Sequence, residues 1–177
     1  ERLTGDTTID WKLRHSIIPL LYTKVDINKK NTIENENVFP SMIIGLDGDD
    51  VLKGSDAGNI LSGGDGDDVL EGRGGDDSLI GGDGHDTASF SESNSSLTID
   101  MAAGTALGSD IGADTMDSIE KVVAGSGDDT LRGGTGNDEF DGGAGDDEYY
   151  VSDGDDTLFT GGGTDTLHIS AGYSIFG

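Results

Sequence analysis

A nine-residue period is the feature that most constrains this chain. From Gly45 the sequence reads GLDGDDVLK, GSDAGNILS, GGDGDDVLE, GRGGDDSLI and GGDGHDTAS, and this first block ends at Ser89. The period resumes at Ala124 with AGSGDDTLR, GGTGNDEFD, GGAGDDEYY, VSDGDDTLF and TGGGTDTLH, followed by a degenerate ISAGYSIFG. Self-similarity at a fixed short period is typical of repeat architectures, in which each unit packs only on its neighbours.

The units share the template G-G-x-G-x-D-x-U-x, in which U is apolar. Glycines at positions 1, 2 and 4 allow sharp turns, while the x-U-x tripeptide is extended and places U on one face. One unit cannot bury its own U residue, so the units must stack. The sequence therefore predicts an all-β fold with a buried column of U residues. These are Leu52, Leu61, Leu70, Leu79, Ala88, Leu131, Phe140, Tyr149, Leu158 and Leu167.

Position 6 offers a carboxylate oxygen beside turns whose carbonyls point inward, and such hard oxygen donors suit calcium. The competing calcium motif, the EF-hand, requires a glutamate at loop position 12. The segment Asp65-Gly66-Asp67 begins like one but runs into Val69 and Leu70, so it fails. The position-6 residues, our candidate metal ligands, are Asp50, Asn59, Asp68, Asp77, Asp86, Asp129, Asp138, Asp147, Asp156 and Asp165.

The template resembles that of the RTX (repeats-in-toxin, haemolysin-type calcium-binding) family. The resemblance implies a right-handed parallel β-roll with two units per coil, and calcium between a turn and the turn one coil later. The implied ligand pairs are Asp50 with Asp68, Asn59 with Asp77, Asp68 with Asp86, Asp129 with Asp147, Asp138 with Asp156, and Asp147 with Asp165. The implied carbonyl ligands are those of position 4: Gly48, Ala57, Gly66, Gly75, Gly84, Gly127, Gly136, Gly145, Gly154 and Gly163.

Several positions depart from the template. Asn59 lacks a charge, so its site is expected to be weaker. Arg73 occupies a usual glycine position, and we expect its guanidinium to point outward. Val151 and Ser152 replace a leading glycine pair, and Ala88 is a small core residue.

Composition indicates dependence on a cation. The formal net charge is −26, from 36 acidic and 10 basic residues, which excludes nucleic acid and anionic membranes as natural partners. The 31 glycines add to the entropic cost of folding. A Gly/Asp-rich chain could instead be a flexible linker, but a linker does not need an apolar residue at every ninth position. The absence of cysteine excludes disulfides and zinc–thiolate sites.

About six calcium ions are expected, each adding about 1.4 kcal/mol at ten times its dissociation constant. The total of about 8 kcal/mol is comparable to the stability of a whole domain. The module should therefore be disordered at low calcium and fold outside the cell. By family resemblance this suits type I secretion, as part of a secreted or surface-bound toxin or adhesin.

Four segments are expected. Residues 1–44 form an N-terminal cap or flanking β segment, 45–89 the first block, 90–123 an irregular β insertion with wider coils, and 124–177 the second block with a C-terminal cap containing Tyr173, Ile175 and Phe176. Within the insertion, 96–101 and 118–123 are predicted strands and 102–112 a loop. We expect one continuous roll, the alternative being two rolls joined by a hinge. Because the chain begins at Glu1 without methionine, we interpret it as part of a longer polypeptide.

No enzymatic motif is found in the sequence. H-E-x-x-H, G-x-S-x-G and P-loop patterns are absent, and neither Pro19 nor Pro40 follows an aspartate that could support Asp-Pro self-cleavage. We therefore expect a non-enzymatic, monomeric module without catalytic residues or cofactors other than calcium. The alternative function is binding of a glycan or host-cell surface, for which only Tyr150 and Phe159 lie at outward position 9.

Overall fold

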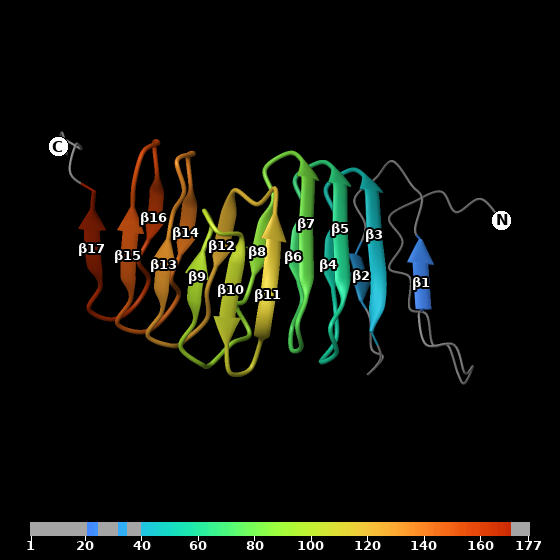
Figure 1. The fold of residues 1–177 in the computed structure, drawn as a ribbon, viewed down its shortest axis with the longest axis horizontal. Coiled ribbons are helices and arrows are strands. Elements are labelled where there is room, and N and C mark those ends of the chain that lie inside the picture. The colour runs from blue at the N-terminus through green and yellow to red at the C-terminus, as the bar shows by residue number, and fades with distance from the viewer. Residues whose placement is uncertain (1–20, 25–31, 35–39, 171–177) are drawn as a thin grey trace.

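The computed structural model describes residues 21–24, 32–34 and 40–170, and in this part the chain is all-β, as predicted. Two sheets face each other along an elongated roll (Figure 1). None of the described residues forms a helix that could cross a membrane. The ten-stranded sheet runs, in spatial order, β1 (Leu21–Lys24), β3 (Ser41–Asp47), β5 (Ile60–Asp65), β7 (Ser78–Asp83), β11 (Gly112–Asp117), β10 (Thr105–Gly108), β9 (Thr98–Asp100), β13 (Thr130–Arg132), β15 (Glu148–Val151) and β17 (Thr166–Ile169). The seven-stranded sheet runs β16 (Thr157–Phe159), β14 (Glu139–Asp141), β12 (Lys121–Val123), β8 (Thr87–Ser89), β6 (Val69–Glu71), β4 (Val51–Lys53) and β2 (Thr32–Glu34).

Parallel pairing in the repeat blocks joins residues two units apart. Leu52 pairs with Leu70 in one sheet, and Leu61 pairs with Leu79 in the other. Successive units therefore alternate between the sheets, and two units complete one coil. This is the parallel β-roll that the family resemblance implied, in which the extended x-U-x tripeptides become the strands and the glycine-rich segments become the turns.

The U column forms the core between the sheets. Eight of its members, from Leu52 to Tyr149 along the chain, are fully buried at 0% exposure. In the insertion Ile99, Val122 and Met116 continue the core at 0%, 0% and 8% exposure. At the C-terminal end of the described part the column is no longer buried, since Leu167 is 46% exposed.

The insertion departs from the predicted pattern. Strand β10 lies inside 102–112, where we predicted a loop, and pairs antiparallel with both β9 and β11 (Figure 1). Its sequence TALG carries no alternation that would predict a strand, and pairing on both sides stabilises it instead. The loop prediction was wrong because pairing with distant segments outweighed local preference.

Both sheets nevertheless run through the insertion without a break. Strand β11 pairs with β7 and β9 pairs with β13 in one sheet, while β12 pairs with both β8 and β14 in the other. At the N-terminal end, β1 pairs with β3 and β2 pairs with β4. The rest of the proposed N-terminal cap, and the C-terminal residues Tyr173, Ile175 and Phe176, lie outside the described residues.

The turns leave no room for a Cβ at some glycines. Gly82 has φ +125°, and a Cβ on it would collide with the carbonyl oxygen of Gly64 one coil earlier. Gly162, by contrast, has no atom within 4 Å of its Cβ position. We expect Gly82→Ala to lower the thermal midpoint in calcium by several degrees, because it adds a left-handed strain of about 1–2 kcal/mol and a backbone clash. Gly162→Ala should leave the midpoint within about one degree; equal effects of the two variants would contradict this interpretation.

Candidate metal sites

Each predicted ligand pair is brought together by the coil repeat. In every pair the backbone N–H of the earlier position-6 residue donates to Oδ1 of the later one, 18 residues on. The distance is 2.7 Å from Asp50 to Asp68, for example, and 2.6 Å from Asn59 to Asp77. The same bond joins Asp68 to Asp86, Asp129 to Asp147, Asp138 to Asp156, and Asp147 to Asp165. The position-6 residues therefore form a ladder of these N–H to carboxylate contacts along each edge of the roll. We call each contacting position a rung.

The second carboxylate oxygen is left without a partner at several rungs. Buried Oδ2 atoms that accept no hydrogen bond belong to Asp68, Asp77, Asp86, Asp114, Asp129 and Asp147. In the turn of Asp68 this oxygen lies where a Cβ on Gly63 would be, so the position-1 glycine makes room for it. A buried carboxylate oxygen without a partner is costly. A cation bound against it would remove that cost.

Burial raises the pKa of these carboxyl groups. The pKa of Asp68, Asp77 and Asp129 rises from 3.8 to about 6, chiefly through loss of hydration, with neighbouring carboxylates contributing. The pKa of Asp114 rises to about 7 for the same first reason, with Asp77 and Asp76 adding repulsion. Burial also raises the pKa of Asp86, Asp138 and Asp147. Neutralisation by a proton or a cation is therefore favourable at these positions.

The turns that carry the carboxylates also stack their backbone from coil to coil. The Cβ positions of Gly66, Gly84 and Gly163 lie against the position-4 carbonyls of Gly48, Gly66 and Gly145, one coil earlier. Gly75 likewise lies over Ala57, Gly145 over Gly127 and Gly154 over Gly136.

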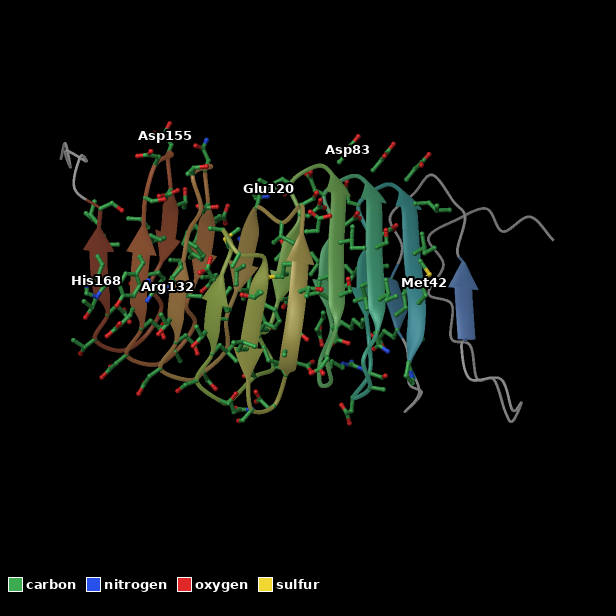
Figure 2. All side chains as sticks on the ribbon, viewed as in Figure 1. Met42, Asp83, Glu120, Arg132, Asp155 and His168 are labelled. Atoms are coloured by element: carbon green, nitrogen blue, oxygen red, sulfur yellow. The ribbon has the colours of Figure 1, made fainter. Side chains whose placement is uncertain are left out.

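Acidic side chains such as Asp83, Glu120 and Asp155 follow one long edge of the roll (Figure 2). Among the described residues no group of three or more His, Cys, Asp or Glu side chains is gathered as a metal cluster. Two carboxylates and several carbonyls thus form the available donor set, and such all-oxygen sets fit calcium.

A family model supports the same conclusion. The RTX calcium-binding nonapeptide repeat matches four times, over residues 53–88, 114–149, 123–158 and 145–174, which together cover more than half of the chain. The chain belongs to the RTX calcium-binding nonapeptide repeat family. No curated protein matches it significantly. Membership makes the roll a structural calcium-binding module, and the RTX turns described above are where its residues would hold calcium.

The departures from the RTX template have local explanations. Asn59 is buried, but its Oδ1 accepts the backbone N–H of Ser55 at 2.6 Å and its Nδ2 donates to Ser41, so this side chain is used within the protein. Arg73 adopts φ +73° at the glycine position, and its guanidinium reaches Glu71 and the carbonyl of Gly54. Ser152 donates to the carbonyl of Gly134, which anchors the turn that lacks the glycine pair.

Sequence reasoning missed three residues in the ladders. The N–H of Asp77 donates to Oδ1 of Asp114 at 2.8 Å, and that of Asp86 donates to Oε2 of Glu120 at 2.8 Å. Leu97 also occupies a rung, because its N–H donates to Oδ1 of Asp129 at 2.7 Å. The half-template G-x-D-x-U over residues 112–116 was the available signal for Asp114. Leu97 and Glu120 differ from the template at position 6 itself, so the sequence carries no comparable signal for them.

The raised pKa values predict how acid acts on the calcium-free chain. A carboxyl whose folded pKa lies above its unfolded value stabilises the fold at low pH, and this contribution is lost as pH rises through the folded pKa, here about 6 to 7. In a chelator, we expect acidification from about pH 7.5 to about pH 5 to increase the β-sheet circular dichroism. At pH 5 the chain remains above its isoelectric point near 4.1. A spectrum that does not change over this interval would contradict the prediction.

Proposed function

We propose that this chain is a calcium-triggered folding module of a larger secreted protein. It is disordered at the low calcium of the cytosol, and it becomes a β-roll where calcium is plentiful outside the cell. In this proposal about six ions bind between the position-6 pairs and the position-4 carbonyls. The blocks 45–89 and 124–177 are the folding units, and 90–123 is an insertion that joins them.

The observation that carries the proposal is the row of buried carboxylate oxygens without partners. At neutral pH the ionised carboxylates repel one another across each pair, on a chain of net charge −26. This repulsion destabilises the folded roll until bound cations neutralise the carboxylates. Extracellular calcium modules bind at about 10⁻⁴–10⁻³ M, a concentration that the cytosol does not reach.

This difference in calcium suits export of an unfolded chain. Type I secretion passes unfolded polypeptide, and folding outside would prevent its return. We propose that the parent protein is a toxin or adhesin exported in this way, that the module is extracellular or on the bacterial surface, and that it acts as a monomer. Secretion of the parent measured with and without external calcium would test the export role: if calcium makes no difference, that role is wrong.

Asp68 offers a sharp test of the proposed ligands because it belongs to two pairs, with Asp50 and with Asp86. We expect Asp68→Asn to lower the number of bound calcium ions by one to two in isothermal titration calorimetry. At ten times the dissociation constant each lost site removes about 1.4 kcal/mol of stability. The matched control is Asp83→Asn, an exposed carboxylate on the same edge (Figure 2). Equal stoichiometry for the two variants would show that Asp68 is not a ligand.

The glycan-binding alternative is weakened at one of its two outward aromatics; the other, Phe159, is 50% exposed. Tyr150 is the outward aromatic on β15, but its ring stacks on His168 with centroids 4.3 Å apart. The guanidinium carbon of Arg132 lies 3.9 Å from the centroid of the same ring. Since Arg132 and His168 pair with Tyr150 from the strands on opposite sides, both ring faces are covered. The ring therefore has no free face on which a sugar could stack.

A further inference from the structure

We propose that the insertion contributes a calcium site of its own, between the turn of Asp77 and the segment Gly112–Asp114. This inference rests on the proposed calcium function of the repeats. It assigns a ligand, Asp114, that lies outside both nonapeptide blocks. The insertion would then be held to the first block by a shared ion as well as by strand pairing.

The first observation is that the start of β11 repeats the contacts of a nonapeptide turn. The N–H of Asp77 donates to Oδ1 of Asp114 at 2.8 Å, and the N–H of Thr115 donates to the carbonyl of Asp77 at 2.9 Å. In the first block the corresponding contacts join Asp68 to Asp86 at 2.9 Å, and Thr87 to Asp68 at 2.8 Å. Asp114 thus occupies position 6, although 37 residues rather than 18 separate it from Asp77.

The neighbouring residues reproduce the rest of the turn. The N–H of Ala113 donates to Oδ1 of Asp76 at 3.0 Å, as the N–H of His85 donates to Oδ1 of Asp67 at 2.9 Å in the repeats. Gly112 adopts φ +89°, and its Cβ position lies against the carbonyl of Gly75. Gly112 is therefore equivalent to the position-4 glycines, which places its backbone over that of Gly75 as a further source of carbonyl oxygens.

The second observation points to a ligand. Asp77 and Asp114 are 3% and 2% exposed, and the Oδ2 atom of each is buried and accepts no hydrogen bond. Among the described residues no lysine or arginine forms an ion pair with either carboxylate. Two adjacent buried carboxylates need a compensating charge. Because the same two turns also stack the backbone of Gly112 on the carbonyl of Gly75, a hard divalent cation such as calcium fits that need.

The opposite edge provides a contrast. Glu120 accepts the N–H of Asp86 and so also occupies a rung of the ladder, but it is only partly buried and is not among the residues with a buried oxygen that lacks a partner. Its turn is also shortened to the residues between β11 and β12, at Ser118–Glu120. The buried negative charge without a partner is therefore greater at Asp114 than at Glu120, and so is the stabilisation that a bound cation would give.

The test compares Asp114→Asn with Asp117→Asn in the full chain. Asparagine at position 114 keeps an oxygen that can accept the N–H of Asp77, but it lacks the negative charge. Asp117 is exposed on the same strand, so Asp117→Asn removes the same charge and serves as the control. Calcium ions are counted by native mass spectrometry and by calorimetry. We expect Asp114→Asn to bind one ion fewer than the wild type, and Asp117→Asn to bind the same number.

The outcomes separate the two proposals. A wild type that binds no calcium would overturn the proposed function and this inference together. A wild type that binds several ions, with an unchanged number in Asp114→Asn, would overturn only the inference. If Asp114→Asn does not fold, wild-type crystals grown in calcium decide the question through anomalous scattering. A peak between the carboxylates of Asp77 and Asp114 supports the site, and peaks at the repeat pairs without one there overturn it.

Discussion

Chelating calcium at neutral pH is expected to abolish the β-sheet circular dichroism of this chain, and restoring millimolar calcium should recover it. Six sites at ten times their dissociation constant contribute about 8 kcal/mol, which is comparable to the whole stability of a typical domain. Without the ions, the buried carboxylates of residues such as Asp68 and Asp129 must be neutralised by protons, which are scarce at pH 7 because their pKa is about 6. The measurement is a far-ultraviolet titration with calcium, monitored at equilibrium.

Magnesium supplies the control for that titration. It requires near-ideal octahedral geometry and gives up its water reluctantly, so turns built from carbonyls and paired carboxylates should select calcium. We expect magnesium at the same concentration to recover little of the signal, and sodium chloride at matched ionic strength to recover little as well. A β-sheet spectrum that persists in chelator would show that the roll folds without cations, and the proposed trigger would then be wrong.

The second large effect is expected from the core. Leu70 is fully buried between the sheets, where it pairs with Leu52 on one side and Ala88 on the other. Leu70→Ala should destabilise the calcium-bound roll by about 2–5 kcal/mol, the usual cost of a large-to-small change in a packed core. Ala88 is already a small member of the column, so little neighbouring volume is available to fill the cavity. Chemical denaturation in saturating calcium measures the difference.

Ile60 provides the matched control. It also lies on a strand of a repeat unit, at the start of β5, but it is 41% exposed. Ile60→Ala should cost less than about 1 kcal/mol, because little area leaves contact with other atoms. If the two variants lose equal stability, the alternation of buried and exposed positions that underlies our account of the fold is wrong.

The repeat period was sufficient to predict most of the roll. It predicted stacked units and the buried column, because one unit cannot bury its own apolar residue, while the resemblance to the RTX family implied parallel coils of two units each. The same resemblance implied the six position-6 pairs, such as Asp138 with Asp156, and the structure brings the members of each pair together. Metal ligation by these pairs stays a prediction.

The insertion could not be predicted in the same way. Strand β10 is stabilised by pairing with β9 and β11, and a segment such as TALG does not reveal its partners. Asp114 was missed because its coil is 37 residues long, so no fixed period connects it with Asp77. A search for the half-template G-x-D-x-U without a required spacing would have found it. The rung occupied by Leu97 carries no template residue, and only backbone contacts identify it.

The antiparallel strand β10 makes the two edges of the roll unequal. Along one edge the backbone ladder runs unbroken past the insertion, from Asp86 to Lys121 and from Glu120 to Glu139. Along the other edge β10 separates the rung of Asp114 from that of Leu97. Order that begins in one block can therefore spread to the other through parallel coils along one edge, but through the antiparallel pairs of β10 along the other. The two blocks are thus stacks of like coils joined through a region of different pairing, and we expect partial calcium loading to order one block before the other.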